Sequence, residues 1–231
     1  NIFVIKQIMF PNSDYYQIEK NYTDEQILIR NSTRDWVNKH VKPIIEEHFQ
    51  KEKTPSYLVE ELSQIGAFGL IIPQEYGGFG ADYLSYGLMM QELERGDSSM
   101  RVISSIQTSL VMYAIYKFGS ESQKQTYLPK LATGEYLGAF GLTEPNFGSN
   151  PSAMHSYYRE DGDNIIINGS KMWIGNAETA DVAIVWVKDE NGIVKGIIVD
   201  TKKVSNFTST SFKDKWSFRA SKTGELVFSD S

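Results

Sequence analysis

The chain has 231 residues, a net charge of −6 and no cysteine. This length supports one large domain or two small ones. The lack of cysteine excludes disulfides, thiolate catalysis and sulfur-ligated metals. Lysine and arginine form no sustained run, so a track for nucleic-acid phosphates is not expected. The apolar segment 1–10 is short and interrupted by Lys6, which argues against both a membrane span and a secretory signal.

The first half of the sequence predicts a helical bundle. Thr23 and Gln26 have capping-box spacing at a helix start, and Pro43 should kink or end that helix. Thr54 followed by Pro55 predicts an N-cap and a proline at the first helical position. Apolar side chains at helical spacing then mark three helices, namely Leu58, Leu62 and Ile65; Tyr86, Met89, Met90 and Leu93; and Ile103, Ile106 and Leu110.

The last predicted helix of this half begins at a second capping box, Ser120 to Gln123, and ends at Gly134. Between the helices, residues 73–80 form a glycine-rich loop. This loop lacks the strand-before, helix-after context of a dinucleotide fingerprint, so it is interpreted as a turn.

The pattern changes to strands near Tyr136. An apolar run at 164–170 ends in an Asn-Gly pair that predicts a turn, and two strands near 182–187 and 193–199 are joined by a hairpin signal. Residues 208–212 and 225–228 fit further strands. The sequence therefore predicts an α+β chain, with a helical domain at 1–135 and a compact antiparallel β domain at 136–231.

Two short segments suggest a ligand. Residues 140–149, Phe-Gly-Leu-Thr-Glu-Pro-Asn-Phe-Gly-Ser, run from a strand into a turn built on Pro145 and Gly148. Residues 171–176, Lys-Met-Trp-Ile-Gly-Asn, place a tryptophan and a glycine where a strand meets a loop. A tight turn that offers N–H groups and hydroxyls beside an indole suits a flat aromatic cofactor.

These two segments resemble the flavin cradle of the acyl-CoA dehydrogenases. Three other segments match the same family in the right order, at 74–80, 119–130 and 218–224. The resemblance spans nearly the whole chain and implies the first two parts of that fold. Its third part, a C-terminal four-helix bundle carrying the catalytic glutamate, is expected to be missing, so that no catalytic residue can be named here.

Carried over by resemblance, the FAD-binding residues are Phe140, Leu142, Thr143, Ser149, Trp173, Ile174 and Gly175. Trp173 would lie against the flavin ring, whereas a lone tryptophan is more commonly an ordinary core aromatic. Gly175 departs from the usual threonine, whose hydroxyl bonds the flavin near N5, and leaves a backbone N–H in its place.

Residues 92–101 and 104–112 resemble the helix pair of glutaryl-CoA dehydrogenases within the family. Arg101 matches the arginine that faces the distal carboxylate of the substrate, and a guanidinium can bind a carboxylate bidentately. The alternative for Arg101 is a structural ion pair with Asp97, four residues earlier. Glu94, Ser105 and Ser149 complete the substrate-binding residues that the resemblance implies, although Glu94 is also typical of an exposed helix glutamate. Val102 departs from the serine that usually follows the arginine.

The function implied is FAD-dependent α,β-dehydrogenation of an acyl-CoA, with oxidative decarboxylation of glutaryl-CoA to crotonyl-CoA favoured. Another acyl chain, or a truncated inactive relative acting as a binding or assembly module, stays open. An electron-transferring flavoprotein would accept the electrons. A homotetramer is expected at full length, in the cytoplasm or in the mitochondrial matrix of a eukaryote. No metal is expected, because the three histidines lack ligand spacing.

Overall fold

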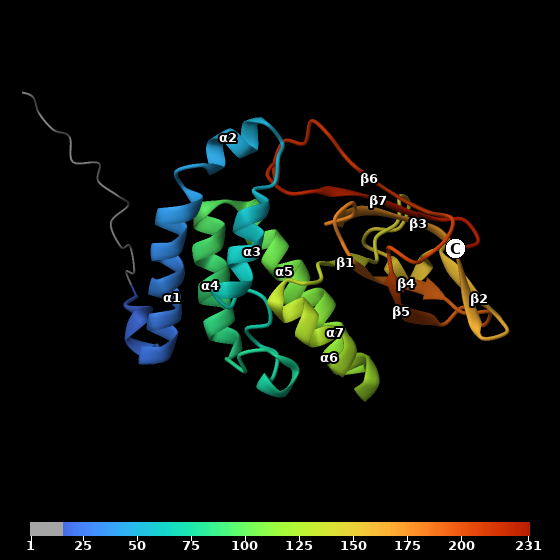
Figure 1. The fold of residues 1–231 in the computed structure, drawn as a ribbon, viewed down its shortest axis with the longest axis horizontal. Helices are drawn as coiled ribbons and strands as arrows, with labels where there is room; N and C mark the ends of the chain where they lie inside the picture. The colour runs from blue at the N-terminus through green and yellow to red at the C-terminus, as the bar shows by residue number, and fades with distance from the viewer. Residues whose placement is uncertain (1–15) are drawn as a thin grey trace, which may run out of the picture.

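A computed structural model describes residues 16–231, with a helical region on one side and a sheet on the other (Figure 1). The segment 1–10 and its expected lack of a membrane span or signal lie outside the described residues. Within 16–231, no helix has the length and apolar character needed to cross a membrane. The helices are α1 (Asp24–Trp36), α2 (Ile45–Gln50), α3 (Ser56–Gln64), α4 (Tyr83–Gly96), α5 (Ser98–Ser105), α6 (Tyr113–Phe118) and α7 (Glu121–Thr133).

The starts and ends of the helices follow local chemistry in most places. Both capping boxes form, at Thr23 and at Ser120, and Gly134 ends α7 with a left-handed φ of 75°. A π-helical turn continues α1 as far as Val41, and the chain then breaks around Pro43 before α2 begins. These predictions are confirmed.

The prediction for the start of α3 is wrong by one residue. Pro55 takes the N-cap position, so α3 begins at Ser56 and Thr54 caps nothing. Pro55 has an extended backbone, with ψ at 91°, which keeps it outside the helix. The Thr54 hydroxyl is buried without a hydrogen-bond partner.

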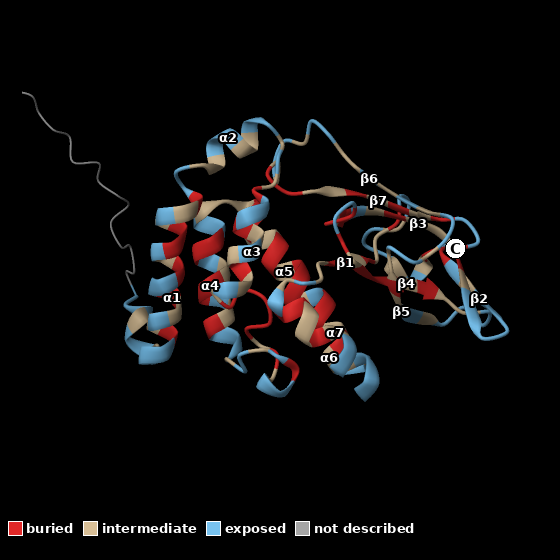
Figure 2. Ribbon diagram, in the orientation of Figure 1, coloured by how far each residue is buried: buried red, intermediate tan, exposed pale blue. Residues whose placement is uncertain are grey.

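The predicted inward stripes form the helical core. Leu58, Leu62 and Ile103 are buried, and Ile106 belongs to a second cluster that reaches the sheet. Leu110 is the exception at 38% exposure. Figure 2 shows the buried surfaces running along the inner faces of α3, α4 and α5 and through the central strands.

The strands form one curled sheet in the order β1-β4-β2-β3-β7-β6, with β5 on the remaining edge of β4. The bounds are β1 (Gly138–Gly141), β2 (Tyr157–Asp161), β3 (Asn164–Gly175), β4 (Val182–Lys188), β5 (Val194–Asp200), β6 (Phe207–Ser211) and β7 (Thr223–Phe228). Four pairings are antiparallel as predicted, whereas β1 and β2 both pair with β4 in parallel. The sheet is therefore mixed rather than purely antiparallel.

The predicted turn at Asn168-Gly169 does not form. Strand β3 continues through it, paired with β2 as far as Asn168 and with β7 from Gly169 onward. Gly169 has a φ of 138°, and a Cβ there would collide with Ser156. The glycine thus serves a close approach of two backbones inside the sheet rather than a hairpin.

A buried glutamine joins the two regions. Gln107, on the π-helical stretch Ile106–Met112 between α5 and α6, donates from Nε2 to the carbonyl oxygens of Leu131 at 2.8 Å and Tyr136 at 2.7 Å. Its Oε1 accepts the Gly138 N–H at 2.8 Å. Gln107 thus bonds to α7, to the segment that follows α7 and to the first residue of β1, so the start of β1 has a defined place relative to the helices.

Candidate functional site

The two ligand-suggesting segments lie side by side. The Met172 N–H donates to the Thr143 carbonyl oxygen at 2.8 Å, just beyond the end of β1. Ser149 follows the turn after Thr143 and is exposed. The structure thus brings the strand end, the turn and the β3 segment into one face.

Trp173 stands out from the sheet and is not a core aromatic. Its side chain is 62% exposed, and it lies at a bulge where the pairing of β3 with β7 shifts between Met172 and Ile174. Its φ of 63° is unusual for an aromatic residue. The Phe212 ring contacts it edge-on, with centroids 4.9 Å apart. An indole held in this way is available to cover a ligand.

Other side chains from these segments face inward. Ile174 is 2% exposed and belongs to the sheet core, so its backbone alone could meet a ligand. Phe140 is half-buried against Trp186, with ring centroids 5.8 Å apart. These two residues build the wall behind the face rather than its surface.

Ile106 occupies the space that a side chain on Gly175 would need. A Cβ on Gly175 would collide with Ile106 Cδ1, whereas the glycine backbone itself is not in the left-handed region. The space for a side chain at this position is therefore taken by an isoleucine from the helices. This packing contact also joins β3 to the turn that follows Ser105.

A buried ion pair lies beneath the turn, and the sequence reasoning missed it. Lys171 Nζ donates to Glu144 Oε1 at 2.7 Å, and the two side chains are 0% and 5% exposed. Glu144 also accepts the N–H groups of Ser156 at 2.9 Å and His155 at 2.7 Å. Both residues lie inside the segments quoted above, but a charged residue type gives no sequence signal of burial.

Hydrogen bonding decides the charge state of this pair. Burial alone would raise the pKa of Glu144, but the bonds from Lys171, Ser156 and His155 outweigh it and lower the pKa to about 2. Burial lowers the pKa of Lys171, and the neighbouring carboxylate opposes that shift. The carboxylate is thus ionised at neutral pH and holds three donors.

Arg101 lies half-buried on α5 and bonds to Glu94 rather than to Asp97. Its Nε donates to Glu94 Oε2 at 2.5 Å, and its Nη1 lies 3.5 Å from the Ser105 hydroxyl oxygen. Asp97 instead caps α5 by accepting the Ser99 N–H at 2.7 Å. The alternative considered for Arg101, an ion pair with Asp97, therefore does not form: Asp97 caps the helix, and Glu94 is the partner of Arg101.

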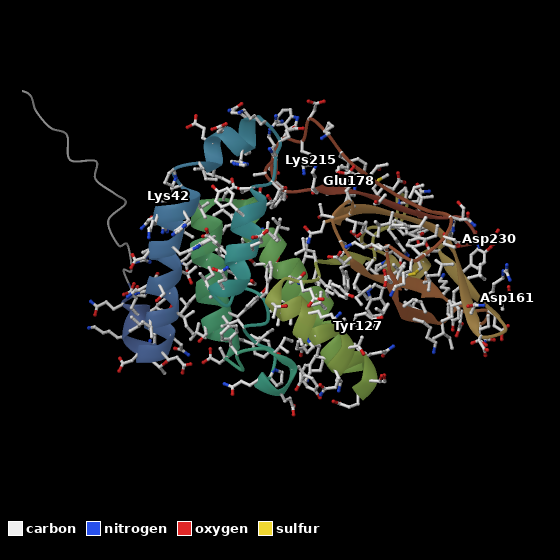
Figure 3. All side chains as sticks on the ribbon, in the orientation of Figure 1. Lys42, Tyr127, Asp161, Glu178, Lys215 and Asp230 are labelled. Atoms are coloured by element: carbon white, nitrogen blue, oxygen red, sulfur yellow. The ribbon has the colours of Figure 1, made fainter. Side chains whose placement is uncertain are left out.

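Phe218 covers the other side of Arg101. The guanidinium carbon lies 5.7 Å from the centre of the Phe218 ring, and Phe218 has a left-handed φ of 53°. The loop that presents it is tied to the helical region by Arg219, which bonds to Glu52 at 2.8 Å and to the Phe49 carbonyl oxygen at 3.1 Å. Figure 3 shows Lys215 on this same loop, which extends from the sheet toward α2.

Comparison with known families decides the membership of the chain. Residues 23–135 match "Acyl-CoA dehydrogenase, N-terminal domain", and residues 139–231 match "Acyl-CoA dehydrogenase, middle domain". The chain belongs to the acyl-CoA dehydrogenase family. The two matches meet where the last helix gives way to β1, and they contain every residue of the site.

Curated relatives carry two different substrate names. The chain is 39% identical over 213 residues to a short-chain-specific acyl-CoA dehydrogenase of Clostridium acetobutylicum, covering 91% of this chain and 56% of the relative. It is 37% identical over 216 residues to a glutaryl-CoA dehydrogenase of Desulfococcus multivorans, covering 89% and 54%. The chain thus spans little more than half the length of these acyl-CoA dehydrogenases.

A solved structure agrees with the fold. The glutaryl-CoA dehydrogenase of Mycobacterium smegmatis in complex with FADH2 superposes with a TM-score of 0.90 at 41% identity, covering 94% of this chain and 55% of the other. The helical region and curled mixed sheet described above are therefore the acyl-CoA dehydrogenase arrangement of these two domains.

Proposed function

We propose that the protein containing this chain uses FAD to dehydrogenate an acyl-CoA thioester between its α and β carbons, and that the acyl group is glutaryl. The observation that carries the substrate assignment is Arg101. This half-buried guanidinium lies on α5, and Ile106, the residue that follows α5, contacts the cradle at Gly175. The 231 residues divide on this account into a helical domain at 1–135 and a β domain at 136–231.

The candidate face fits a flavin. The Thr143 N–H has no hydrogen-bond partner among the described residues, and the exposed indole of Trp173 stands beside it. An unpartnered donor next to an aromatic surface suits the polar edge and the flat face of an isoalloxazine. Leu142, Thr143, Ser149 and the backbones of Ile174 and Gly175 would hold the group, with Phe140 behind them.

Bound FAD would supply a two-electron acceptor beside the substrate. The contribution of this chain is to bind and to orient. Thr143 and Ser149 would fix the cofactor and thioester, and Trp173 would exclude water from one side. Holding the reacting carbons in place removes orientational freedom before the reaction. The proton-abstracting glutamate is expected outside these 231 residues.

Arg101 has the chemistry to select a second carboxylate. Glu94 occupies its Nε, and Nη1 has a long contact to Ser105, whereas Nη2 has no hydrogen-bond partner within residues 16–231. A substrate carboxylate could add two charge-assisted bonds there, whereas a methyl end could add none. Burial alone would raise the pKa of Glu94, but its bonds from Ser98 and Arg101 lower it, so this glutamate stays ionised and keeps Arg101 in place.

Further features follow from the same proposal. Loss of carbon dioxide from the dehydrogenated glutaryl group would give crotonyl-CoA, and an electron-transferring flavoprotein would take the electrons. We propose a homotetramer for the full-length protein, located in the cytoplasm or, in a eukaryote, in the mitochondrial matrix.

The second candidate is a short straight-chain acyl-CoA. Its supporting observation is that Glu94 already neutralises Arg101 within the chain, at 2.5 Å. Such a pair needs no substrate carboxylate. Val102 beside the arginine also departs from the glutaryl pattern.

Turnover of two substrates distinguishes the candidates. The full-length protein, purified with FAD, is assayed with glutaryl-CoA and with butyryl-CoA, and crotonyl-CoA and carbon dioxide are measured. We expect glutaryl-CoA to have the higher kcat/KM and to release carbon dioxide. Preference for butyryl-CoA would assign the short-chain activity, and no flavin with no turnover would favour an inactive binding module.

A further inference from the structure

The buried Lys171–Glu144 pair has no part in the function described so far. It joins three pieces of chain, namely the residues after β1, the middle of β3 and the loop before β2. Lys171 is fully buried, with its Nζ also 3.3 Å from the Leu142 carbonyl oxygen. Such a pair is costly to bury, so its retention suggests a task that apolar packing would not perform.

The peptide between Leu142 and Thr143 shows what that task is. Peptide bonds in the described residues are trans, so the carbonyl oxygen and the N–H of one peptide point in opposite directions. Lys171 holds the Leu142 carbonyl oxygen toward the buried pair. The Thr143 N–H of the same peptide must then point away from the pair, toward the exposed face.

The next peptide is held inward in the same manner. The Thr143 carbonyl oxygen accepts the Met172 N–H, one residue beyond Lys171. The Glu144 N–H on its other side bonds to the Phe147 carbonyl oxygen at 3.2 Å and closes the turn. Among the described residues, the Thr143 N–H alone of these two peptides' N–H groups stays without a partner.

We propose that the Lys171–Glu144 pair is a positioning device that presents the Thr143 N–H to the bound cofactor. Lys171 anchors the Leu142 carbonyl oxygen, and Glu144 anchors Lys171 through its own bonds to the loop at His155 and Ser156. Neither side chain touches the cofactor, since both are buried beneath the turn. The inference rests on the proposed flavin function and names how that site is held in shape.

The chain offers a matched control in the helical region. Glu92 on α4 is 1% exposed and bonds to Arg34 and to Arg95, each at 2.6 Å. It is a buried, ion-paired carboxylate like Glu144, but it joins α1 to α4 on the far side of the helices from the sheet (Figure 1). Its loss should lower stability without disturbing the turn.

The experiment compares Lys171→Met, Glu144→Gln and Glu92→Gln in the full-length protein. Circular dichroism gives each melting temperature, and the FAD dissociation constant is measured at a temperature where each variant is folded. We expect Lys171→Met to weaken FAD binding at least about tenfold and Glu144→Gln to weaken it less, because the glutamine still accepts one bond from Lys171. Glu92→Gln should bind FAD as the wild type does, despite a lower melting temperature.

Four results would overturn the inference. Folded Lys171→Met with wild-type affinity for FAD would show that the pair does not shape the site. If the loss of FAD affinity follows the loss of melting temperature equally in all three variants, the pair contributes only to general stability. If Lys171→Met does not fold, the test passes to Glu144→Gln. An FAD affinity equal to that of the wild type in this variant would also show that the pair does not shape the site. Failure of the wild type to bind FAD would instead remove the proposed flavin function, and this inference with it.

Discussion

The two ion pairs of the candidate site differ in burial, and the difference separates two tasks. Lys171 and Glu144 are 0% and 5% exposed beneath the cradle, whereas Arg101 and Glu94 are 29% and 44% exposed on the helices. In the first pair, Glu144 also accepts the backbone N–H groups of His155 and Ser156, and Lys171 also donates to the Leu142 carbonyl oxygen, so that several bonds fix its geometry. The second can exchange partners with little cost in stability. We infer that the cradle shapes the site and that the helix end selects the ligand.

The largest expected effect is on the free energy of unfolding, and it is measured by breaking each ion pair in turn. Lys171→Met leaves the Glu144 carboxylate buried without its cation, and it should lower the free energy of unfolding by about 3–5 kcal/mol. Arg101→Met, in a half-exposed pair, should cost about 1 kcal/mol or less. Urea denaturation of both variants measures the difference. Similar losses would contradict the contrast between the two pairs.

The contact between Gly175 of the sheet and Ile106 of the helical region gives a second, smaller effect on stability. Gly175→Ala places a methyl group against Ile106 Cδ1 and should destabilise the protein by about 1–3 kcal/mol through overpacking. Ile106→Val removes that Cδ1, so the double variant should be more stable than the sum of the single changes predicts. Thermal unfolding of all four proteins completes the cycle. Strict additivity would mean that the two residues do not meet.

The backbone plan could be predicted from the sequence because local signals were strong. Capping boxes at Thr23 and Ser120 and the hairpin at 189–192 act through nearby backbone groups, and each formed as expected. The Asn168-Gly169 turn failed because tertiary packing required a glycine where Ser156 approaches. The parallel placement of β1 depends on Gln107, which no local pattern in the sequence reveals.

The site was predicted in part. Resemblance gave the exposed face around Trp173 and the cluster of Arg101, Glu94 and Ser105, which the structure brings together. It gave no indication that Ile174 points into the core. The Lys171–Glu144 pair also escaped, because burial of a charge depends on partners distant in sequence.

The pH dependence of the free energy of unfolding should differ between variants of Glu144 and Glu94, the glutamates of the two ion pairs. The pKa of Glu144 is about 2 in the folded protein, below its ordinary value of 4.5. Its ionised form therefore stabilises the protein above pH 4.5, and that contribution is lost as the pH falls from about 4.5 toward 2. We expect the free energy of unfolding of Glu144→Gln to depend less on pH over this range than that of the wild type.

Glu94→Gln is the control for this titration. Glu94 is half-exposed, and its lowered pKa should contribute a smaller slope over the same range. Unfolding free energies at several pH values measure both variants. A Glu144→Gln slope equal to that of the wild type would show that the buried carboxylate is not the titrating group.

The central claim is that Arg101 selects a substrate carboxylate, and one measurement tests it directly. In the full-length protein with FAD bound, kcat/KM is determined for glutaryl-CoA and butyryl-CoA before and after Arg101→Ala. The variant loses charge-assisted bonds to one substrate only. The ratio of kcat/KM for glutaryl-CoA to that for butyryl-CoA should therefore fall roughly 10- to 150-fold, which corresponds to about 1.5–3 kcal/mol. Equal losses for both substrates would contradict the account and leave Arg101 as the structural partner of Glu94.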